Sequence, residues 1–157
     1  MASLQDHPEA LYDVRVSGIL MDNTGKEAAK MLKKLTPNLM VEDLTPTLKF
    51  YREVLGFEVV MTLPEQAPFD FAIVKRDGVE LMFQSRASLS ENVPALAGSP
   101  IGASQTFYIE VTDLDALYTQ LRDRVEIVVD LHTTFYGTRE FYFRDLNGYI
   151  LSFSEAT

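Results

Sequence analysis

The side chains of this chain that could do chemistry are mainly glutamates. The sequence contains no cysteine and only two histidines. This composition excludes disulfides, thiolate metal sites and cysteine nucleophiles. Glu80 and Glu140 could act as an acid and base pair if both are buried, and Glu80 with His132 could begin a metal site. Alternatively, Glu140 pairs with Arg139 or Arg144 and Glu80 lies in solvent. The catalytic residues, and whether the protein is an enzyme, therefore stay open at this point.

The stretch 36–57 predicts the elements that position such side chains. Apolar and polar residues first alternate, which is typical of a strand with two different faces. Asp43 or Thr45 can then cap a helix, in which Pro46 costs no hydrogen bond in the first turn. Gly56 ends the helix. The stretch therefore predicts a strand, a helix and the start of a second strand.

An internal repeat appears when the chain is compared with itself at an offset of 70 residues. Repeats of this length are longer than solenoid units and indicate two copies of a larger module. The matching glycines and aspartates mark turns and caps, which argues against chance similarity of apolar segments. Matching pairs are Thr36 and Thr106, Val41 and Val111, Asp43 and Asp113, Val59 and Val129, Gly78 and Gly148, and Phe83 and Phe153.

The repeat divides the chain into four parts. We expect an N-terminal extension at 1–35, a first module at 36–86, a linker at 87–103 and a second module at 104–157. The extension either packs on a partner subunit or covers its own domain, and its pattern predicts a strand at 12–20 and a helix at 25–34.

Each module reads as strand, helix and three strands. Asp77-Gly78 and Asn147-Gly148 supply the matching tight turns, and His132 falls in a predicted loop. The remaining elements are strands at 57–63, 69–76 and 79–85, a helix at 113–124, strands at 125–130, 139–144 and 149–154, and the loop at 131–138.

Charge and hydropathy exclude several partners. The formal net charge of −9 argues against phosphate-backbone binding, so we expect no nucleic acid partner. No apolar run approaches membrane-spanning length, so no membrane association is expected. Asp6, Glu9 and Asp13 fall where a signal peptide would need a basic and then an apolar stretch. A cytoplasmic protein is expected.

Three motifs resemble the vicinal oxygen chelate superfamily, which includes glyoxalase I, bleomycin-resistance proteins and ring-cleaving dioxygenases. The resemblance covers about residues 36–155 and is strongest to glyoxalase and bleomycin-resistance members. It implies an α+β fold of two βαβββ modules, whose strands form an incomplete eight-stranded barrel with helices outside and a ligand cavity inside. The motifs are Val41-Glu-Asp-Leu with Phe50-Tyr-Arg-Glu-Val-Leu-Gly-Phe57, Asp77-Gly-Val-Glu-Leu81, and Tyr136-Gly-Thr-Arg-Glu-Phe-Tyr-Phe-Arg-Asp-Leu-Asn-Gly148.

Given this fold, strand alternation separates core from cavity. The apolar set Leu39, Val41, Phe107, Ile109 and Val111 should pack under the helices, and the opposite face should line the cavity. The expected cavity residues are Thr36, Asn38, Met40, Glu80, Met82, Gln84, Thr106, Tyr108, Glu110, Glu140, Tyr142, Arg144 and Ser152.

The resemblance also implies where a metal would be held. The ligand positions of metal-dependent members fall on Thr36, Thr106, Ser152 and either Glu80 or Met82. Neutral hydroxyls are poor ligands for Zn, Ni or Fe and bring no charge to the ion. We therefore expect no metal and no cofactor.

The function expected from these features is metal-independent binding of a small molecule. Carboxylates and tyrosines on the cavity face suit a cationic or planar aromatic compound, and bleomycin-resistance proteins sequester such a drug in grooves between two subunits. The alternative is a lyase, isomerase or dioxygenase that uses a non-standard metal site or a carboxylate pair. Open strand edges lead us to expect a homodimer.

Overall fold

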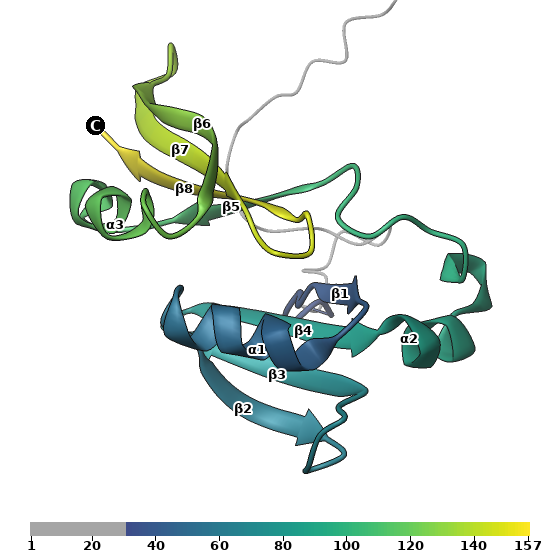
Figure 1. Cartoon of the computed structure of the whole chain (residues 1–157). Coiled ribbons are helices and arrows are strands. Elements are labelled where there is room, and N and C mark those ends of the chain that lie inside the picture. Colours follow the sequence, from purple (N-terminus) through teal and green to yellow (C-terminus); the bar gives the residue numbers. More distant parts are fainter. Residues whose placement is uncertain (1–30) are drawn as a thin grey trace, which may run out of the picture. The chain divides into compact units, whose positions relative to one another are not determined.

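The computed structural model describes residues 31–157, and the chain divides into two units, residues 1–35 and 36–157 (Figure 1). The predicted strand at 12–20 lies outside the described residues, as does most of the predicted helix at 25–34. Residues 31–37 form neither helix nor strand. No helix in the described part is long and apolar enough to span a membrane.

The larger unit has the two βαβββ modules that the repeat predicts. A short connection between them contains α2 (Arg86–Asn92) and a 3-10 turn (Pro94–Leu96), where the sequence predicts only a linker. The first module consists of β1 (Asn38–Val41), α1 (Leu44–Glu53), β2 (Glu58–Leu63), β3 (Phe71–Arg76) and β4 (Val79–Ser85). The second consists of β5 (Thr106–Glu110), α3 (Leu114–Leu121), β6 (Glu126–Thr133), β7 (Thr138–Arg144) and β8 (Ile150–Ala156).

Each module forms its own four-stranded sheet, in the orders β1-β4-β3-β2 and β5-β8-β7-β6. The first strand of each module lies at one edge and runs parallel to the last strand. The other pairings are antiparallel. The sheets are not hydrogen-bonded into a closed barrel, which confirms the α+β fold and its incomplete barrel.

Matching caps and turns start the same elements in both modules. The Asp43 carboxylate accepts a 2.9 Å hydrogen bond from the backbone N–H of Thr45 at the start of α1, and Asp113 accepts one of 3.3 Å from Ala116 at the start of α3. Such caps satisfy backbone donors that a helix leaves unpaired. Asp43, one of the two predicted candidates, is thus the N-cap of α1.

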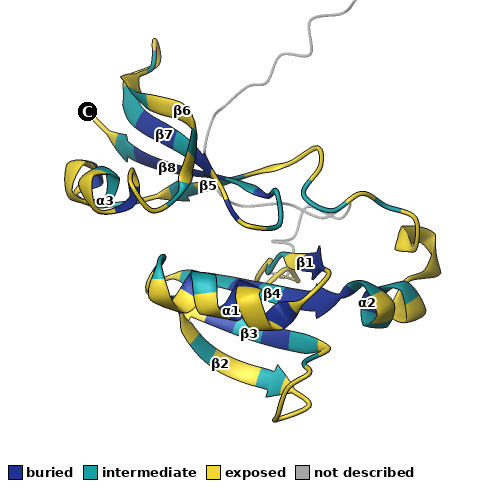
Figure 2. Ribbon diagram, in the orientation of Figure 1, coloured by how far each residue is buried: buried dark blue, intermediate teal, exposed yellow. Residues whose placement is uncertain are grey.

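The hydrophobic core lies between each sheet and its helix (Figure 2). Leu39, Val41 and Phe83 are buried beneath α1, and each such side chain contributes about 1.5–3 kcal/mol by leaving water. In the second module Phe141 and Leu151 are buried beneath α3. The apolar face that strand alternation predicts is therefore the core face.

The turn between β7 and β8 joins the second module to the first. The Tyr149 hydroxyl donates a 2.7 Å hydrogen bond to the carbonyl of Met40 in β1. The Asn147 amide donates one of 3.1 Å to the hydroxyl of Thr47 in α1, and the turn residue Asp145 bonds a buried tyrosine of α1, Tyr51. This joint is polar and buried.

The predicted loop at 131–138 is wrong in its first part. His132 lies on β6, where it pairs with Glu140, and Thr133 pairs with Arg139. The strand therefore continues past Asp130, because pairing with β7 satisfies the backbone of residues that carry no strong strand signal of their own.

Candidate functional site

The expected cavity residues of the first module are engaged with one another. Asn38 lies beside Met82, and Met40 lies beside Gln84, across the β1–β4 pairing. The Asn38 amide donates a 2.8 Å hydrogen bond to Gln84, whose own amide bonds Ser88 at 2.8 Å. Met40 and Gln84 are buried. This face therefore offers few unpartnered polar groups to a ligand.

Glu80 is close to the first of the implied metal positions. The Thr36 hydroxyl donates a 3.3 Å hydrogen bond to its carboxylate. His132, the other half of the proposed non-standard metal pair, lies on the sheet of the second module. Residues 31–157 contain no group of three or more His, Asp or Glu side chains that could hold a metal ion. The hydroxyl donors at the implied positions do not fit a divalent metal.

In the second module the expected residues form rows on the face that points away from α3. Tyr108, Ser152 and Tyr142 lie side by side on β5, β8 and β7. A neighbouring row contains Glu110, Ser154 and Glu140. The third row contains Thr106, Ile150 and Arg144, and the Arg144 guanidinium pairs with Glu126 at 3.4 Å. We call this surface the open face.

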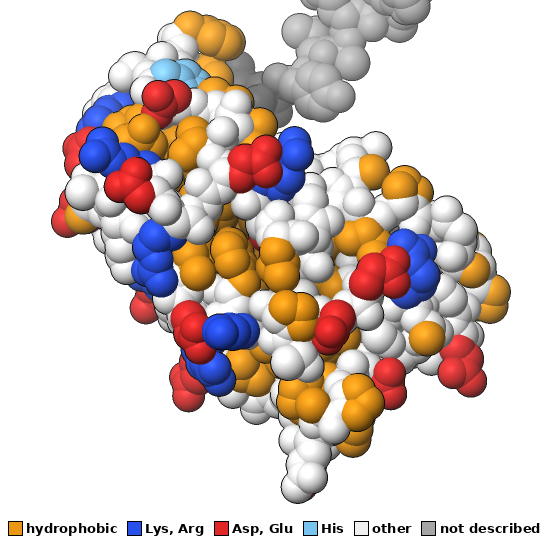
Figure 3. Space-filling view, in the orientation of Figure 1, with side chains coloured by type: hydrophobic (Ala, Val, Ile, Leu, Met, Phe, Trp, Pro, Cys, Tyr) orange, Lys and Arg blue, Asp and Glu red, His pale blue; other side chains and the backbone are white. Residues whose placement is uncertain are grey.

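A polar cluster surrounds Glu140 on the open face. The Glu140 carboxylate is 3% exposed and accepts a 2.9 Å hydrogen bond from the Tyr142 hydroxyl. The Tyr136 hydroxyl makes longer contacts of 3.3 and 3.4 Å with its two oxygens. His132 Nε2 lies 3.7 Å from Oε1, and Figure 3 shows the histidine of the described chain at the surface. We call these four residues the Glu140 cluster.

No arginine among residues 31–157 forms an ion pair with this carboxylate. Arg139, its neighbour in sequence, forms a bidentate pair with Asp115 at 2.6 and 2.7 Å, and Arg144 pairs with Glu126. Successive strand residues point to opposite faces, so Arg139 points toward α3 while Glu140 does not. The alternative that Glu140 pairs with either arginine is wrong.

The hydroxyl of Tyr142, which donates to Glu140, has a raised pKa. Burial raises the pKa of the Tyr142 hydroxyl, its hydrogen bond to Glu140 raises it further, and the Ser152 hydroxyl opposes the shift. Ser152 Oγ is itself fully buried and makes no hydrogen bond of ordinary geometry within the described chain. The phenol therefore stays protonated and keeps donating to Glu140 well into the alkaline range.

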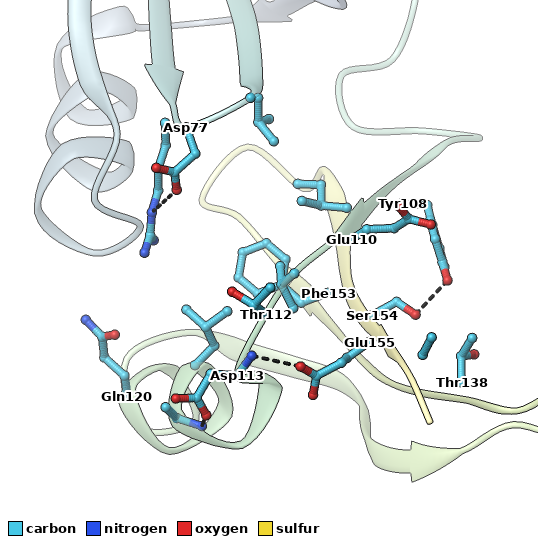
Figure 4. Close-up of a pocket in the computed structure, with 18 of the residues that line it drawn as sticks. Asp77, Tyr108, Glu110, Thr112, Asp113, Gln120, Thr138, Phe153, Ser154 and Glu155 are labelled. Carbon is cyan, nitrogen blue, oxygen red and sulfur yellow. Dashed lines mark hydrogen bonds and ion pairs between the residues drawn. The ribbon is translucent and has the colours of Figure 1, made fainter.

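A groove of about 1020 Å³ runs along β5, beside the open face (Figure 4). Its walls are β5 and the residues that follow it, α3, the end of β8 and the turn between β3 and β4. Of the expected cavity residues, Tyr108 and Glu110 line this groove. Other lining residues include Phe57, Arg76, Asp77, Val79, Asp113, Leu117, Phe153 and Glu155.

Sequence reasoning missed Tyr136 and the residues of the β3–β4 turn. Tyr136 belongs to a loop, so strand alternation assigns it to neither face. Asp77 and Val79 were assigned only to a turn and a strand start. The offset of 70 residues was the signal that could have placed them, because it pairs them with the turn that joins the modules.

The fold and the site together define a duplicated βαβββ protein with a polar open face. Residues 32–153 match the model of the Glyoxalase/Bleomycin resistance protein/Dioxygenase superfamily, and the chain belongs to this superfamily. No curated protein sequence matches the chain.

Solved structures share the fold. A glyoxalase/bleomycin resistance protein/dioxygenase from Nocardioides is 23% identical, with a TM-score of 0.65, over 82% of this chain and 87% of that one. TioX from Micromonospora sp. ML1 is 19% identical, with a TM-score of 0.63, over 80% and 100%. The bleomycin-binding protein of Streptomyces verticillus, in complex with copper(II)-bleomycin, is 25% identical, with a TM-score of 0.54, over 81% and 100%.

Proposed function

We propose that the protein binds a small organic cation with a planar or aromatic body on the open face of the second sheet, and that it needs no metal ion to do so. One observation carries the proposal: the buried Glu140 carboxylate has tyrosines and a histidine around it, and no Lys or Arg of the described chain forms an ion pair with it. A buried carboxylate without a cation is a strong anchor for one.

The contacts of Glu140 indicate how a ligand would reach it. Tyr142 holds the carboxylate at 2.9 Å, whereas the Tyr136 contacts are long and the Tyr136 side chain is 57% exposed. A ligand ammonium group can therefore replace the Tyr136 hydroxyl and leave the bond from Tyr142 in place. The tyrosine rings then border the cation and stack on its planar body.

The similarity to a bleomycin-binding protein supports small-molecule binding as the function. That structure holds copper(II)-bleomycin. In this chain the open face of the second sheet presents Tyr108, which is 51% exposed and whose hydroxyl lies 2.6 Å from Ser154 Oγ. An aromatic surface beside an anchoring carboxylate suits a planar cation.

Fluorescence titration of the full chain with proflavine, a planar aromatic cation, tests the proposal. We expect saturable binding that Glu140→Gln weakens at least about tenfold, because the charge-assisted contact is lost. Tyr136→Phe removes the competing hydroxyl and should bind at least as tightly as the wild type. Glu91→Gln, a change at an exposed glutamate of α2, is the control. Equal affinity of wild type and Glu140→Gln would refute the proposal.

Metal content is the second test. The protein is purified without a histidine tag or chelator, dialysed against Ni, Zn, Mn and Fe(II), and submitted to elemental analysis. We expect no retained metal. About one tightly held ion per chain would overturn the metal-free proposal and favour a lyase, isomerase or dioxygenase that uses Glu80, Glu140 and His132.

We also propose a homodimer as the functional form. The two sheets of one chain are not paired with each other, and open edges favour pairing between chains. Sedimentation velocity should give a species of twice the monomer mass, whereas a single monomer peak at all concentrations would rule the dimer out.

A further inference from the structure

The offset of 70 residues relates two contacts between a turn and the opposite module. In the first contact, the β7–β8 turn is fully engaged. Tyr149 bonds the carbonyl of Met40 at 2.7 Å, and Asn147 bonds Thr47 at 3.1 Å. These residues fill the space between the turn and β1 with a ring and paired polar groups.

The second contact has none of these partners. Seventy positions from Tyr149 and Met40 lie Val79 and Glu110, and seventy from Asn147 and Thr47 lie Asp77 and Leu117. A valine has no hydroxyl or ring with which to reach β5, and Leu117 cannot accept a hydrogen bond from residue 77.

All four of these counterparts line the groove. The groove therefore lies at the second contact, where a valine, Val79, stands in place of the tyrosine.

The edge of β5 offers backbone groups to this space. The N–H of Val111 donates to the carbonyl of Ser154 in β8 at 2.9 Å, so the backbone groups of every second residue counted from Val111 point toward β8. Tyr108 and Glu110 lie between those residues, and their backbone N–H and C=O groups point away from β8. Within residues 31–157 no partner for these groups is found. On β1, by contrast, Tyr149 caps the equivalent carbonyl of Met40.

The charge around the groove is negative. Asp77, Glu110, Asp113 and Glu155 line it, against one arginine, Arg76. The Arg76 guanidinium is already used, since it donates a 2.5 Å hydrogen bond to the carbonyl of Leu55 and lies 3.8 Å from Asp77. Figure 4 shows Asp77 on the turn and the other three carboxylates on β5, α3 and β8. Apolar side chains such as Phe57 and Phe153 lie between them.

We propose that this groove binds a short, extended, basic peptide by strand addition to β5. Strand addition uses the unpaired N–H and C=O groups of an edge strand for affinity and pockets for alternate side chains for specificity. Here the apolar walls receive one set of side chains, and Glu110, whose side chain points to the other face of β5, receives Lys or Arg from the other set. The volume of the groove lies at the upper end of the range for small-ligand pockets, which is roughly 300–1,000 Å³.

Isothermal titration calorimetry of the full chain with the blocked peptide acetyl-Lys-Val-Lys-Val-Lys-amide tests the proposal. We expect saturable binding that is lost when alternate peptide nitrogens are methylated, because methylation removes the ladder donors. The decisive variant is Val79→Tyr, which restores the tyrosine that the other contact has. It should fill the groove and weaken binding at least tenfold. Val60→Tyr, at an exposed position of β2 outside the groove, is the matched control.

Other outcomes overturn the proposal. No binding of the peptide, binding unchanged in Val79→Tyr, or equal binding of the methylated peptide or of butylamine would each do so. If Val79→Tyr does not fold, Glu110→Lys replaces it, with the same expected loss. The peptide test depends on Val79 and the proflavine test on Glu140, so the two proposals can fail independently.

Discussion

The Tyr51 hydroxyl donates a 2.9 Å hydrogen bond to Oδ2 of Asp145, although the two residues belong to different modules. The other carboxylate oxygen accepts 2.8 Å bonds from the backbone N–H groups of Asn147 and Tyr149. One buried side chain therefore shapes the β7–β8 turn and holds it against α1. Burial raises the pKa of Tyr51 well above its ordinary value, and the charge of Asp145 raises it further.

Tyr51→Phe should lower the free energy of unfolding by about 1.5–3 kcal/mol, because it leaves a buried carboxylate without one of its donors. Urea unfolding followed by circular dichroism measures the change. Tyr149→Phe removes a bond to a neutral carbonyl and should cost about 1 kcal/mol. A smaller loss in Tyr51→Phe than in Tyr149→Phe would contradict this ranking.

Stability should fall with rising pH because of Asp145. Burial raises the pKa of this carboxyl, against the hydrogen bonds that lower it. The folded protein thus holds the Asp145 proton more tightly than the unfolded chain does. The protonated carboxyl therefore adds its full contribution to the free energy of unfolding below the unfolded pKa of about 3.9, and this contribution is lost as pH rises through the folded pKa.

Asp145→Asn removes this titration. The difference in unfolding free energy between wild type and variant should decrease between about pH 3 and pH 7, as urea unfolding at each pH would show. A difference that stays constant, or that increases, would mean that Asp145 does not titrate in this way.

The pKa of Tyr142 should fall in Glu140→Gln. Burial, the largest cause of the raised value, remains, but the hydrogen bond to the carboxylate and its charge are removed. NMR titration of protein labelled with 13C at the tyrosine Cζ measures the change. Glu126→Gln should leave the pKa of Tyr142 unaltered, and an unaltered value in Glu140→Gln would show that the two side chains do not interact.

Gly102→Ala should be strongly destabilising, by about 3 kcal/mol or more. Gly102 has a φ of +79°, and a Cβ there would lie 2.6 Å from the backbone carbon of Gly148 and 2.8 Å from the carbonyl oxygen of Asn147. Gly98→Ala is the control, because a Cβ at Gly98 meets nothing within 4 Å. Thermal unfolding of both variants checks the prediction, which fails if their melting temperatures agree.

Much of the fold could be predicted from the sequence, because its signals are local. The alternation of Leu39 and Val41 gives the core face of β1, and Asp43 marks the start of α1. His132 shows the limit: its place on β6 depends on pairing with Glu140, which local propensity does not contain.

The site was harder to predict, because the alternation of strand residues shows which face of the sheet a side chain lies on, but not which loop residues pack over that face. It placed Glu140 and Tyr142 on one face, yet another hydroxyl that contacts Glu140 belongs to Tyr136, a loop residue. The groove is lined by Val79, a small side chain at the position where the second module has Tyr149. Comparing the two modules only at positions where their residues match does not reveal a difference of this kind.

The two modules differ in their turns: the β7–β8 turn holds the modules together, and the β3–β4 turn lines the groove. Asp145 and Tyr149 lock the modules together from one side, so the β3–β4 turn from Asp77 to Val79 does not have to repeat that lock. We expect substitutions there to change the groove at a smaller cost in stability than substitutions at Asp145 or Tyr149. Because the two modules repeat the same architecture, the β3–β4 turn can vary in sequence, by evolution or by protein engineering, to change what the groove binds.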